Sequence, residues 1–146
     1  MEDEKILFYY EYEDNGWFSN YWPVTIILDG KVWHSTEHYY QAQKTLDRDY
    51  QERIRLAATS DDAKRLGNND EIVLRPDWDT YKITAMRIAL WAKFTQDPAL
   101  KEKLLSTGDR ELVENSPRDY YWGIGADGSG RSMLGKLLME LRDNLR

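Results

Sequence analysis

The sequence contains no cysteine, only two histidines and only four prolines among its 146 residues. The lack of cysteine excludes disulfides, thiol catalysis and cysteine-ligated metals. Basic residues are also in deficit, with 20 Lys and Arg against 26 Asp and Glu, which gives a net charge of −6. That balance counts against non-specific attraction to nucleic acid or to an anionic membrane surface. No apolar run reaches the ~18 residues of a membrane span, so we expect no membrane partner.

The first five residues, MEDEK, are acidic, whereas a secretory signal begins with a basic stretch followed by an apolar one. We therefore expect a cytoplasmic protein. A chain of 146 residues has the length of about one domain, and we expect a single domain over residues 1–146. Aromatic residues are in excess, at 13% with six Trp and ten Tyr. They either build a core of large rings or line a pocket for a planar or sugar-like ligand.

The pattern along the chain predicts an α+β fold that is mostly helical, with about six helices and a small antiparallel sheet from the N-terminal third. β-Branched and aromatic residues predict a strand over 5–12, and Asp29-Gly30 is a hairpin signal between Val24–Leu28 and Lys31–Trp33. Helices are expected over 36–46, 50–58, 60–67, 80–95, 98–107 and 132–144, with a short strand at Leu112-Val113. Apolar stripes predict buried faces on two helices: Ile83, Met86, Leu90 and Phe94, and Leu134, Leu137, Leu138, Leu141 and Leu145.

The segment His34-Ser-Thr-Glu-His38 has the H-x-x-E-H spacing of an inverted zinc-protease motif. That motif needs both histidines on one helix face. Here His34 ends a predicted strand, and Ser35 or Thr36 is expected to cap the helix on which His38 lies. Two rings placed in this way do not converge on one ion, and we expect no metal.

A glycine-rich stretch, Gly123–Gly130, contains the G-x-G-x-x-G pattern of dinucleotide-binding loops. Such a loop follows a buried parallel strand inside a βαβ unit, and the preceding Tyr120–Trp122 is too short for that strand. The stretch is therefore either a flexible turn or a loop whose N–H groups hold an anion before the last helix. Arg131 and Lys136 add positive charge nearby.

Glu37, Gln41 and Lys44 are separated by four and three residues, which places them on one face of the predicted helix. A row of a carboxylate, an amide and an amine is either a solvated surface stripe or one wall of a pocket. Tyr40 lies in the same stripe, and the helix follows directly on an aromatic-rich hairpin. In a pocket, Glu37 would act as a general acid or base and Lys44 as a nucleophile or a cation. The spacing alone leaves both interpretations open.

Several blocks of the sequence together resemble the NADAR (YbiA-like) family. The opening blocks are Phe18-Ser-Asn-Tyr-Trp-Pro23, Asp29-Gly30 and Ser35-Thr-Glu-His-Tyr-Tyr-Gln-Ala-Gln-Lys44. The later blocks are Met86-Arg-Ile-Ala-Leu-Trp-Ala-Lys-Phe94, Asp119-Tyr-Tyr-Trp-Gly123, Asp127-Gly-Ser-Gly-Arg131 and Leu134-Gly-Lys-Leu-Leu-Met-Glu-Leu-Arg142. They occur in order over nearly the whole chain. One position departs from the family pattern, because Ser132 stands where we would expect Asn.

The resemblance implies an N-glycosidase that cleaves the bond between ribose C1′ and a base or amine without a cofactor. It implies two substrate classes and does not choose between them. One is ADP-ribose attached to guanine, free or within nucleic acid, and the other is a phosphoribosylamino-pyrimidine intermediate of riboflavin synthesis. A non-catalytic module that binds ADP-ribose or a nucleotide is an alternative, since the same aromatic and glycine features would serve it. A metal-dependent hydrolase is a third hypothesis, and no obligate protein partner is indicated.

The resemblance also implies roles for three blocks, 18–22, 37–44 and 119–131, which we expect to converge on one pocket. Catalysis is expected from Glu37, Lys44 and Asp119, with either Lys44 or Glu37 attacking C1′. Arg131 or Arg118 would hold the substrate phosphate. Substrate contacts are expected from the following residues: Phe18, Asn20, Trp22, Tyr40, Gln41, Trp122, Gly123, Gly128 and Arg131.

Overall fold

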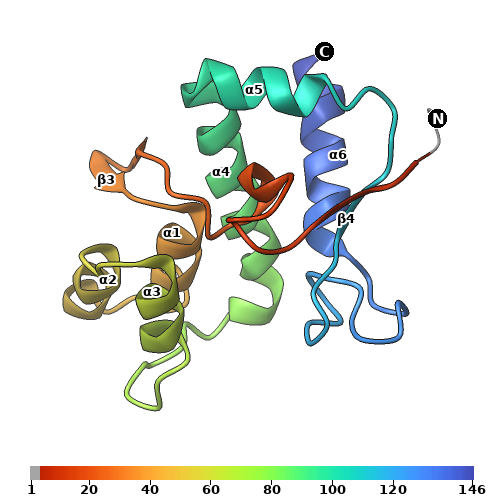
Figure 1. Cartoon of the computed structure of the whole chain (residues 1–146). Helices are drawn as coiled ribbons and strands as arrows, with labels where there is room; N and C mark the ends of the chain where they lie inside the picture. Colours follow the sequence, from red (N-terminus) through yellow and green to blue (C-terminus); the bar gives the residue numbers. More distant parts are fainter. Residues whose placement is uncertain (1–3) are drawn as a thin grey trace. The chain divides into compact units, whose positions relative to one another are not determined.

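The computed structural model of the chain describes residues 4–146 (Figure 1). Residues 1–3, part of the acidic start that argues against a signal peptide, lie outside the described residues. The elements in order are β1 (Ile6–Phe8), η1 (Gly16–Phe18), β2 (Ile26–Leu28), β3 (Lys31–Trp33), α1 (Thr36–Ala42), α2 (Arg48–Arg55), α3 (Ser60–Gly67), α4 (Trp78–Gln96), α5 (Pro98–Leu105), β4 (Leu112–Glu114) and α6 (Met133–Leu145). The described residues form two compact units, Asn20–Gln96 and residues 4–19 together with Asp97–Arg146. The single domain expected over 1–146 stays a prediction.

Helix α1 is the buried element of the Asn20–Gln96 unit, and it packs against α2, α3 and α4 (Figure 1). Every residue of α1 is buried, although four of the seven are polar or charged. A helix buried on all sides must satisfy its polar groups inside the protein. The core around it is formed by Ile26, Trp33, Tyr39, Ala42, Tyr50, Ile54, Ala63, Ala89 and Ala92.

Strands β2 and β3 form the predicted antiparallel hairpin, with Ile26 opposite Trp33 and Leu28 opposite Lys31. The turn residues Asp29 and Gly30 have φ angles of 56° and 73°. Two consecutive positive φ angles are the requirement of a type I′ turn, which Asp-Gly meets at low cost. The hairpin signal in the sequence is therefore confirmed.

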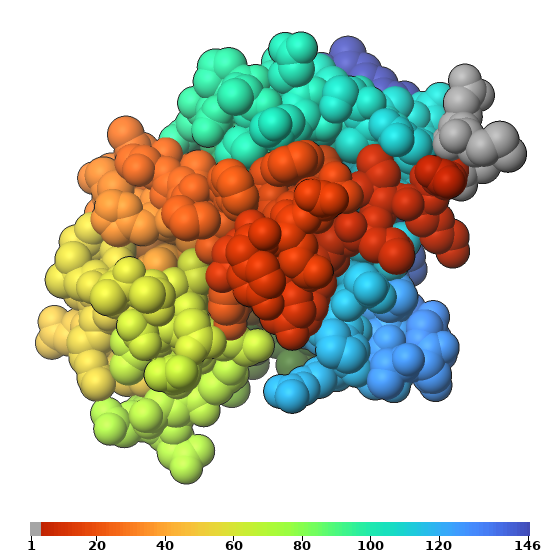
Figure 2. All heavy atoms as spheres, viewed as in Figure 1, coloured from red at the N-terminus to blue at the C-terminus, as the bar shows by residue number. Residues whose placement is uncertain are grey.

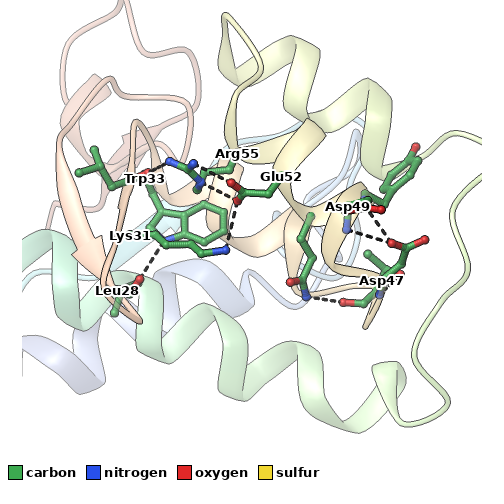
Figure 3. Close-up of polar contacts among 11 residues, drawn as sticks. Leu28, Lys31, Trp33, Asp47, Asp49, Glu52 and Arg55 are labelled. Carbon is green, nitrogen blue, oxygen red and sulfur yellow. Dashed lines mark hydrogen bonds and ion pairs between the residues drawn. The ribbon is translucent and has the colours of Figure 1, made fainter.

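Polar contacts join this hairpin to α2 (Figure 3). Glu52 accepts hydrogen bonds from Lys31 on β3 at 3.3 Å and from its helical neighbour Arg55 at 2.7 Å. The hydrogen bond from Arg55 is the main reason why the pKa of the Glu52 carboxyl is lowered to about 2. Arg55 also donates to the carbonyl of Val32 at 3.2 Å. In Figure 2 the orange atoms of the hairpin lie against the yellow atoms of α2, as these contacts require.

In the other unit, β1 pairs with β4 in parallel, with Ile6 opposite Leu112 and Phe8 opposite Glu114. The expected strand over 5–12 thus ends at Phe8, and it lies outside the antiparallel hairpin. Alternation of residue types shows that a segment is a strand, but its direction depends on which distant segment it meets. Helix α6 packs against β4 and buries most of the predicted leucine stripe, with Leu134, Leu137, Leu138 and Leu141 at most 6% exposed. The last member of the stripe, Leu145, lies at the end of the helix and is only partly buried.

The predicted helix over 36–46 ends four residues early, at Ala42. The following residues leave the helix to meet the segment before α4. Thr45 forms an antiparallel bridge with Leu74, and the N–H of Arg75 donates to the carbonyl of Lys44 at 2.7 Å. The N–H groups of residues 43–45 still donate to carbonyls of α1, and the contacts with residues 74 and 75 end the helix there. A partner more than 25 residues away thus decides where α1 ends.

The buried face of α2 gives a direct test of the core. Ile54 is fully buried, whereas Leu56, at the end of the same helix, is 68% exposed. We expect Ile54→Ala to lower the free energy of unfolding by about 2–5 kcal/mol, because it removes buried methyl groups and leaves a cavity. The matched control Leu56→Ala should change it by less than about 0.5 kcal/mol. Urea unfolding followed by circular dichroism measures both, and equal losses would contradict the described packing.

Candidate active site

The first turn of α1 is fixed by its own cap and by Asn20. The Oγ of Ser35 accepts the N–H of His38 at 3.1 Å. The hydroxyl of Thr36 donates to the side-chain oxygen of Asn20 at 2.8 Å, and the Asn20 carbonyl accepts the N–H of Glu37 at 3.2 Å. Asn20, which we expected to contact substrate, is 8% exposed and binds the helix that carries Glu37.

Glu37 and Gln41 lie one turn apart on α1 and are 6% and 4% exposed. The Nε2 of Gln41 donates to Oε2 of Glu37 at 2.8 Å. The Oε1 of Gln41 is buried against Gly67 of α3 and has no hydrogen-bond partner among residues 4–146. A Cβ at position 67 would overlap this oxygen, so only glycine lets α3 approach so closely. Two members of the expected row, Glu37 and Gln41, are therefore buried, and Gln41 orients the carboxylate of Glu37.

Lys44 lies just beyond α1 and is partly buried. Its Nζ donates to the carbonyl of Gly67 at 3.3 Å and to Oδ1 of Asn68 at 3.1 Å. Burial lowers the pKa of the Lys44 amine below its ordinary value. Among nearby charges, the Glu37 carboxylate opposes this shift and the Lys64 ammonium adds to it. An amine with a lowered pKa is a better nucleophile near neutral pH, because more of it is uncharged.

Two aromatic residues that we expected to contact substrate, Tyr40 and Trp22, belong to the same unit. Tyr40 is 7% exposed, and its ring centroid lies 5.2 Å from that of Trp78 on α4. Trp22 is partly exposed, in the loop that follows Asn20. The substrate contacts expected from Tyr40 and Trp22 stay predictions.

Phe18 belongs to the other unit, where it is 1% exposed. Its ring meets Phe8 of β1 edge-on at 5.8 Å and Trp17 at 6.0 Å. This packing gives Phe18 a core position, and its expected contact with the substrate base stays a prediction.

Asp119 organises the turn that precedes the glycine-rich loop. Its Oδ1 accepts the N–H groups of Tyr121 at 2.8 Å and Trp122 at 2.7 Å. The Trp122 ring is partly exposed and stands edge-on to Tyr121, 4.9 Å away. One carboxylate oxygen of Asp119 therefore has a structural role whatever the other one does.

The glycine-rich loop satisfies most of its own hydrogen bonds. Gly123 admits no side chain, because a Cβ there would lie 2.7 Å from the Cβ of Ser116, and Gly128 has a φ of 79°. Backbone carbonyls of the same unit accept the N–H groups of Ile124, Gly128, Gly130, Arg131, Ser132, Met133 and Leu134. The positive charge that this loop offers an anion therefore comes from the Arg131 guanidinium, which is exposed beside the Tyr121 ring.

Ser132, the residue that departs from the family pattern, adopts a left-handed conformation with φ 48°. Asn tolerates this conformation better than Ser, because its side chain bonds locally to the backbone. The Oγ of Ser132 makes no cap bond to α6 and accepts the N–H of Glu114 on β4 at 3.2 Å. The serine thus joins the start of α6 to β4.

The two histidines do not form a metal site. The Nε2 of His38 lies 3.0 Å from the carbonyl of Ala57, which can only accept, so Nε2 carries the proton. Its Nδ1 lies 2.7 Å from the hydroxyl of Ser35 and accepts from it. With both nitrogens engaged, His38 is a buried structural histidine. In residues 4–146 no group of three or more His, Asp or Glu side chains is arranged to hold a metal ion.

Lys93 on α4 is a titratable residue to which we assigned no role from the sequence. It is fully buried, and burial lowers its pKa to about 7. A signal for it exists, because position 93 continues the buried stripe of Met86 and Leu90 with a charged residue. Lys93 is a second amine that is partly neutral near physiological pH.

The predicted site residues thus form two groups. Asn20, Trp22, Glu37, Tyr40, Gln41 and Lys44 belong to one unit, and Phe18, Asp119, Trp122, Gly123, Gly128 and Arg131 belong to the other. Within the first unit, the structure brings Asn20, Glu37, Gln41 and Lys44 together. The expectation that the three blocks meet in one pocket stays a prediction.

These features define a small α+β protein with a buried carboxylate on helix α1 and a partly buried amine just beyond the end of that helix. The model of the NADAR domain matches residues 7–146 of the chain. The chain therefore belongs to the NADAR family, as its sequence blocks indicated. None of the helices described here has the length and apolar character needed to cross a membrane.

Relatives with curated names extend this result. The chain is 46% identical over 147 residues to N-glycosidase YbiA of Escherichia coli (strain K12), an alignment that covers 99% of this chain and 91% of that protein. The NMR structure of E. coli YbiA matches with a TM-score of 0.91, over 99% of this chain and 86% of that one. The chain is also 40% identical over 144 residues to riboflavin biosynthesis protein VVA0006 of Vibrio vulnificus (strain YJ016), covering 99% of this chain and 39% of that protein. The expected fold class is confirmed by the likeness to YbiA.

The environment of His38 predicts a pH dependence of stability. Burial lowers the pKa of His38 below its ordinary value of 6.5, against a smaller opposing effect of the hydrogen bond to Ala57. The unfolded chain takes up this proton near pH 6.5, whereas the folded chain does so only at lower pH. The free energy of unfolding should therefore fall as the pH drops below about 6.5, by at most about 1.4 kcal/mol per pH unit for this group.

Replacement of His38 should remove that part of the pH dependence. We expect His38→Gln to show a shallower loss of stability between about pH 6.5 and 5 than the unmodified chain. The exposed His34 provides the comparison: its charge contributes less than burial to the lowered pKa of His38, so His34→Gln should change the slope less than His38→Gln does. Urea midpoints measured at several pH values test this, and identical slopes for all three proteins would contradict it.

Proposed function

We propose that this protein hydrolyses an N-glycosidic bond at ribose C1′, with Glu37 and Lys44 as catalytic residues. The observation that carries the proposal is the row of buried Glu37, buried Gln41 and partly buried Lys44, in a chain 46% identical to a protein named N-glycosidase. A buried carboxylate beside a partly desolvated amine is costly in a purely structural helix. It is useful where protons and a nucleophile must be supplied to a bound substrate.

Glu37 is suited to proton transfer and charge stabilisation. Cleavage of an N-glycosidic bond develops positive charge at C1′ and negative charge on the departing nitrogen. An ionised carboxylate stabilises the first charge, and its acid form supplies a proton to the second. The hydrogen bond from Gln41 at 2.8 Å holds Oε2 and so orients the Glu37 carboxylate for this part.

Lys44 is suited to covalent catalysis on an opened ribose. An N-linked ribose that opens its ring presents an imine at C1′, and the neutral Lys44 amine adds to that carbon. The base amine then leaves with a proton from Glu37, and a Schiff base remains between C1′ and Nζ. Water adds to C1′, and breaking of the C1′–Nζ bond releases ribose and restores the lysine. The lowered pKa of Lys44 supports this role, because the step needs an uncharged amine.

For the substrate, we propose a phosphoribosylamino-pyrimidine, the class associated with riboflavin synthesis. The name of the Vibrio vulnificus relative supports this class. The net charge of −6 also favours a small metabolite over ADP-ribosylated guanine within nucleic acid, since binding to phosphate backbones needs a basic surface. A small phosphorylated metabolite suits the expected cytoplasmic location. We also propose that Arg131 binds the substrate phosphate and that Asp119 and Trp122 act at the base.

Direct comparison of the two substrate classes tests this choice. Purified protein is incubated with the phosphoribosylamino-pyrimidine and, in parallel, with DNA that carries ADP-ribosylated guanine, and mass spectrometry reads out the released base. We expect release from the pyrimidine at least ten times faster. Release from the modified DNA alone would overturn the proposed substrate while keeping the reaction type. No release from either would contradict the proposed activity.

Replacement of the carboxylate should slow the reaction strongly. Glu37→Gln keeps the size of the side chain and removes its acid–base function, so kcat should fall by about 10²–10⁴-fold. Glu102→Gln, on the exposed face of α5, is the control and should keep the original kcat. Steady-state kinetics with a thermal melt of each variant makes the comparison. A Glu37→Gln variant that folds and retains full kcat would exclude catalysis by Glu37.

The covalent step can be trapped on Lys44. Borohydride added during turnover reduces a Schiff base, and we expect a stable mass increase on the peptide that contains Lys44. Lys44→Arg should lose most turnover while it still binds substrate, because a guanidinium stays charged. Lys64→Arg, close by on α3, is the matched control. Peptide mapping also covers Lys93, and an adduct there or nowhere would contradict the role of Lys44.

A further inference from the structure

The C-terminal end of α3 holds the amine of Lys44, and neither of the residues that do so has a role in the mechanism above. Nζ of Lys44 donates to the carbonyl of Gly67 at 3.3 Å and to Oδ1 of Asn68 at 3.1 Å. Both acceptors are neutral. They contact the amine from α3, an element separate from the helix that carries Glu37.

The backbone of Asn68 is itself fixed. Its N–H donates to the carbonyls of Lys64 at 3.0 Å and Arg65 at 3.3 Å, which makes Asn68 the C-cap residue of α3. The last carbonyls of a helix carry partial negative charge and attract cations. A lysine ammonium directed at this end meets a helix terminus and a side-chain oxygen together.

The same turn of α3 also packs against the side chain of Gln41. Its Oε1 lies against Gly67, where any side chain would overlap it, while its Nε2 holds Glu37. One turn of α3 thus contacts both the amide that orients the carboxylate and the amine that the reaction needs. A simple interaction of a lysine with a helix end would not also need α3 to pack against Gln41.

The charged groups that act on Lys44 are Glu37 from α1 and Lys64 from α3, and they have opposite effects. Burial is the largest influence and favours the neutral amine. The two acceptors on α3 favour the charged amine, because a carbonyl oxygen accepts more strongly from an ammonium. The protonation of Lys44 therefore depends on a balance to which Asn68 contributes directly.

We propose that Asn68, together with the carbonyl of Gly67, is a positioning residue that holds Lys44 as an ammonium in the resting enzyme. Loss of one proton from Nζ weakens both hydrogen bonds and leaves the neutral amine able to turn toward C1′. The importance of this device for catalysis rests on the proposed function, in which Lys44 attacks C1′. The position of Lys44 against α3 does not depend on that reaction.

The experiment measures the reactivity of Lys44 without using turnover. The full chain is labelled with trace acetic anhydride at several pH values, and mass spectrometry gives the labelling rate of the Lys44 peptide, since only neutral amines react. We expect Asn68→Ala to raise the rate near neutral pH by about threefold, as for a shift of half a pKa unit. Asn68→Asp places a carboxylate on the amine and should slow labelling at least as much. Asn69→Ala, at the next position, is the matched control and should keep the original rate.

The outcomes separate this proposal from the proposed function. The role of Asn68 is supported if Asn68→Ala is labelled fastest, the unmodified chain more slowly and Asn68→Asp most slowly. Equal rates or the reverse order would overturn it. Asn68 is exposed, and a thermal melt of each variant confirms that the fold is retained. The pH profile of kcat is then measured on the same proteins. A profile that shifts with the labelling midpoint supports Lys44 as the nucleophile, whereas shifted labelling with an unshifted profile would reject that function and keep the contact.

Discussion

The burial of a polar helix is the constraint on which the rest of the Asn20–Gln96 unit depends. A buried polar group without a partner costs about 1–3 kcal/mol, and most polar side chains of α1 are paired, either within the helix or with the segments around it. Thr36 donates a hydrogen bond to Asn20, and His38 donates one to the carbonyl of Ala57. Glu37 accepts a hydrogen bond from Gln41 on its own helix. These bonds fix the loop before α1 and the segment after α2. The unit is specified by satisfied polar groups as much as by its apolar core.

The same burial also changes the protonation of Lys44. Removal of water from around Lys44 favours its neutral form, and the nearby carboxylate of Glu37 resists that change. The opposing effects leave the amine sensitive to small neutral contacts such as those of α3. An exposed lysine would gain little from them, because water competes for every hydrogen bond. The burial that the fold requires around α1 is therefore also the cause of the reactivity expected of Lys44.

The glycine-rich loop differs from α1, because its order comes mainly from backbone hydrogen bonds and not from paired side chains. Its backbone N–H groups bond to carbonyls of the same unit, and Asp119 closes the preceding turn with Oδ1. A loop bonded in this way is ordered before any ligand arrives, so it presents side chains such as Trp122 and Arg131 in defined places. In this loop Gly123 allows close packing, and Gly128 adopts a positive φ. Neither role was visible in the G-x-G-x-x-G spelling.

The sequence alone determined the features that rest on neighbouring residues. The Asp29-Gly30 turn, a helix cap at Ser35 or Thr36 and the leucine face of α6 follow from local backbone preference and helical period. The family followed from ordered blocks over most of the chain. Only the tertiary structure decided where α1 ends, that β1 runs parallel to β4, and that Gly67 and Asn68 meet Gln41 and Lys44. These contacts join residues more than 20 positions apart, and no local pattern in a single sequence specifies which distant segments will meet.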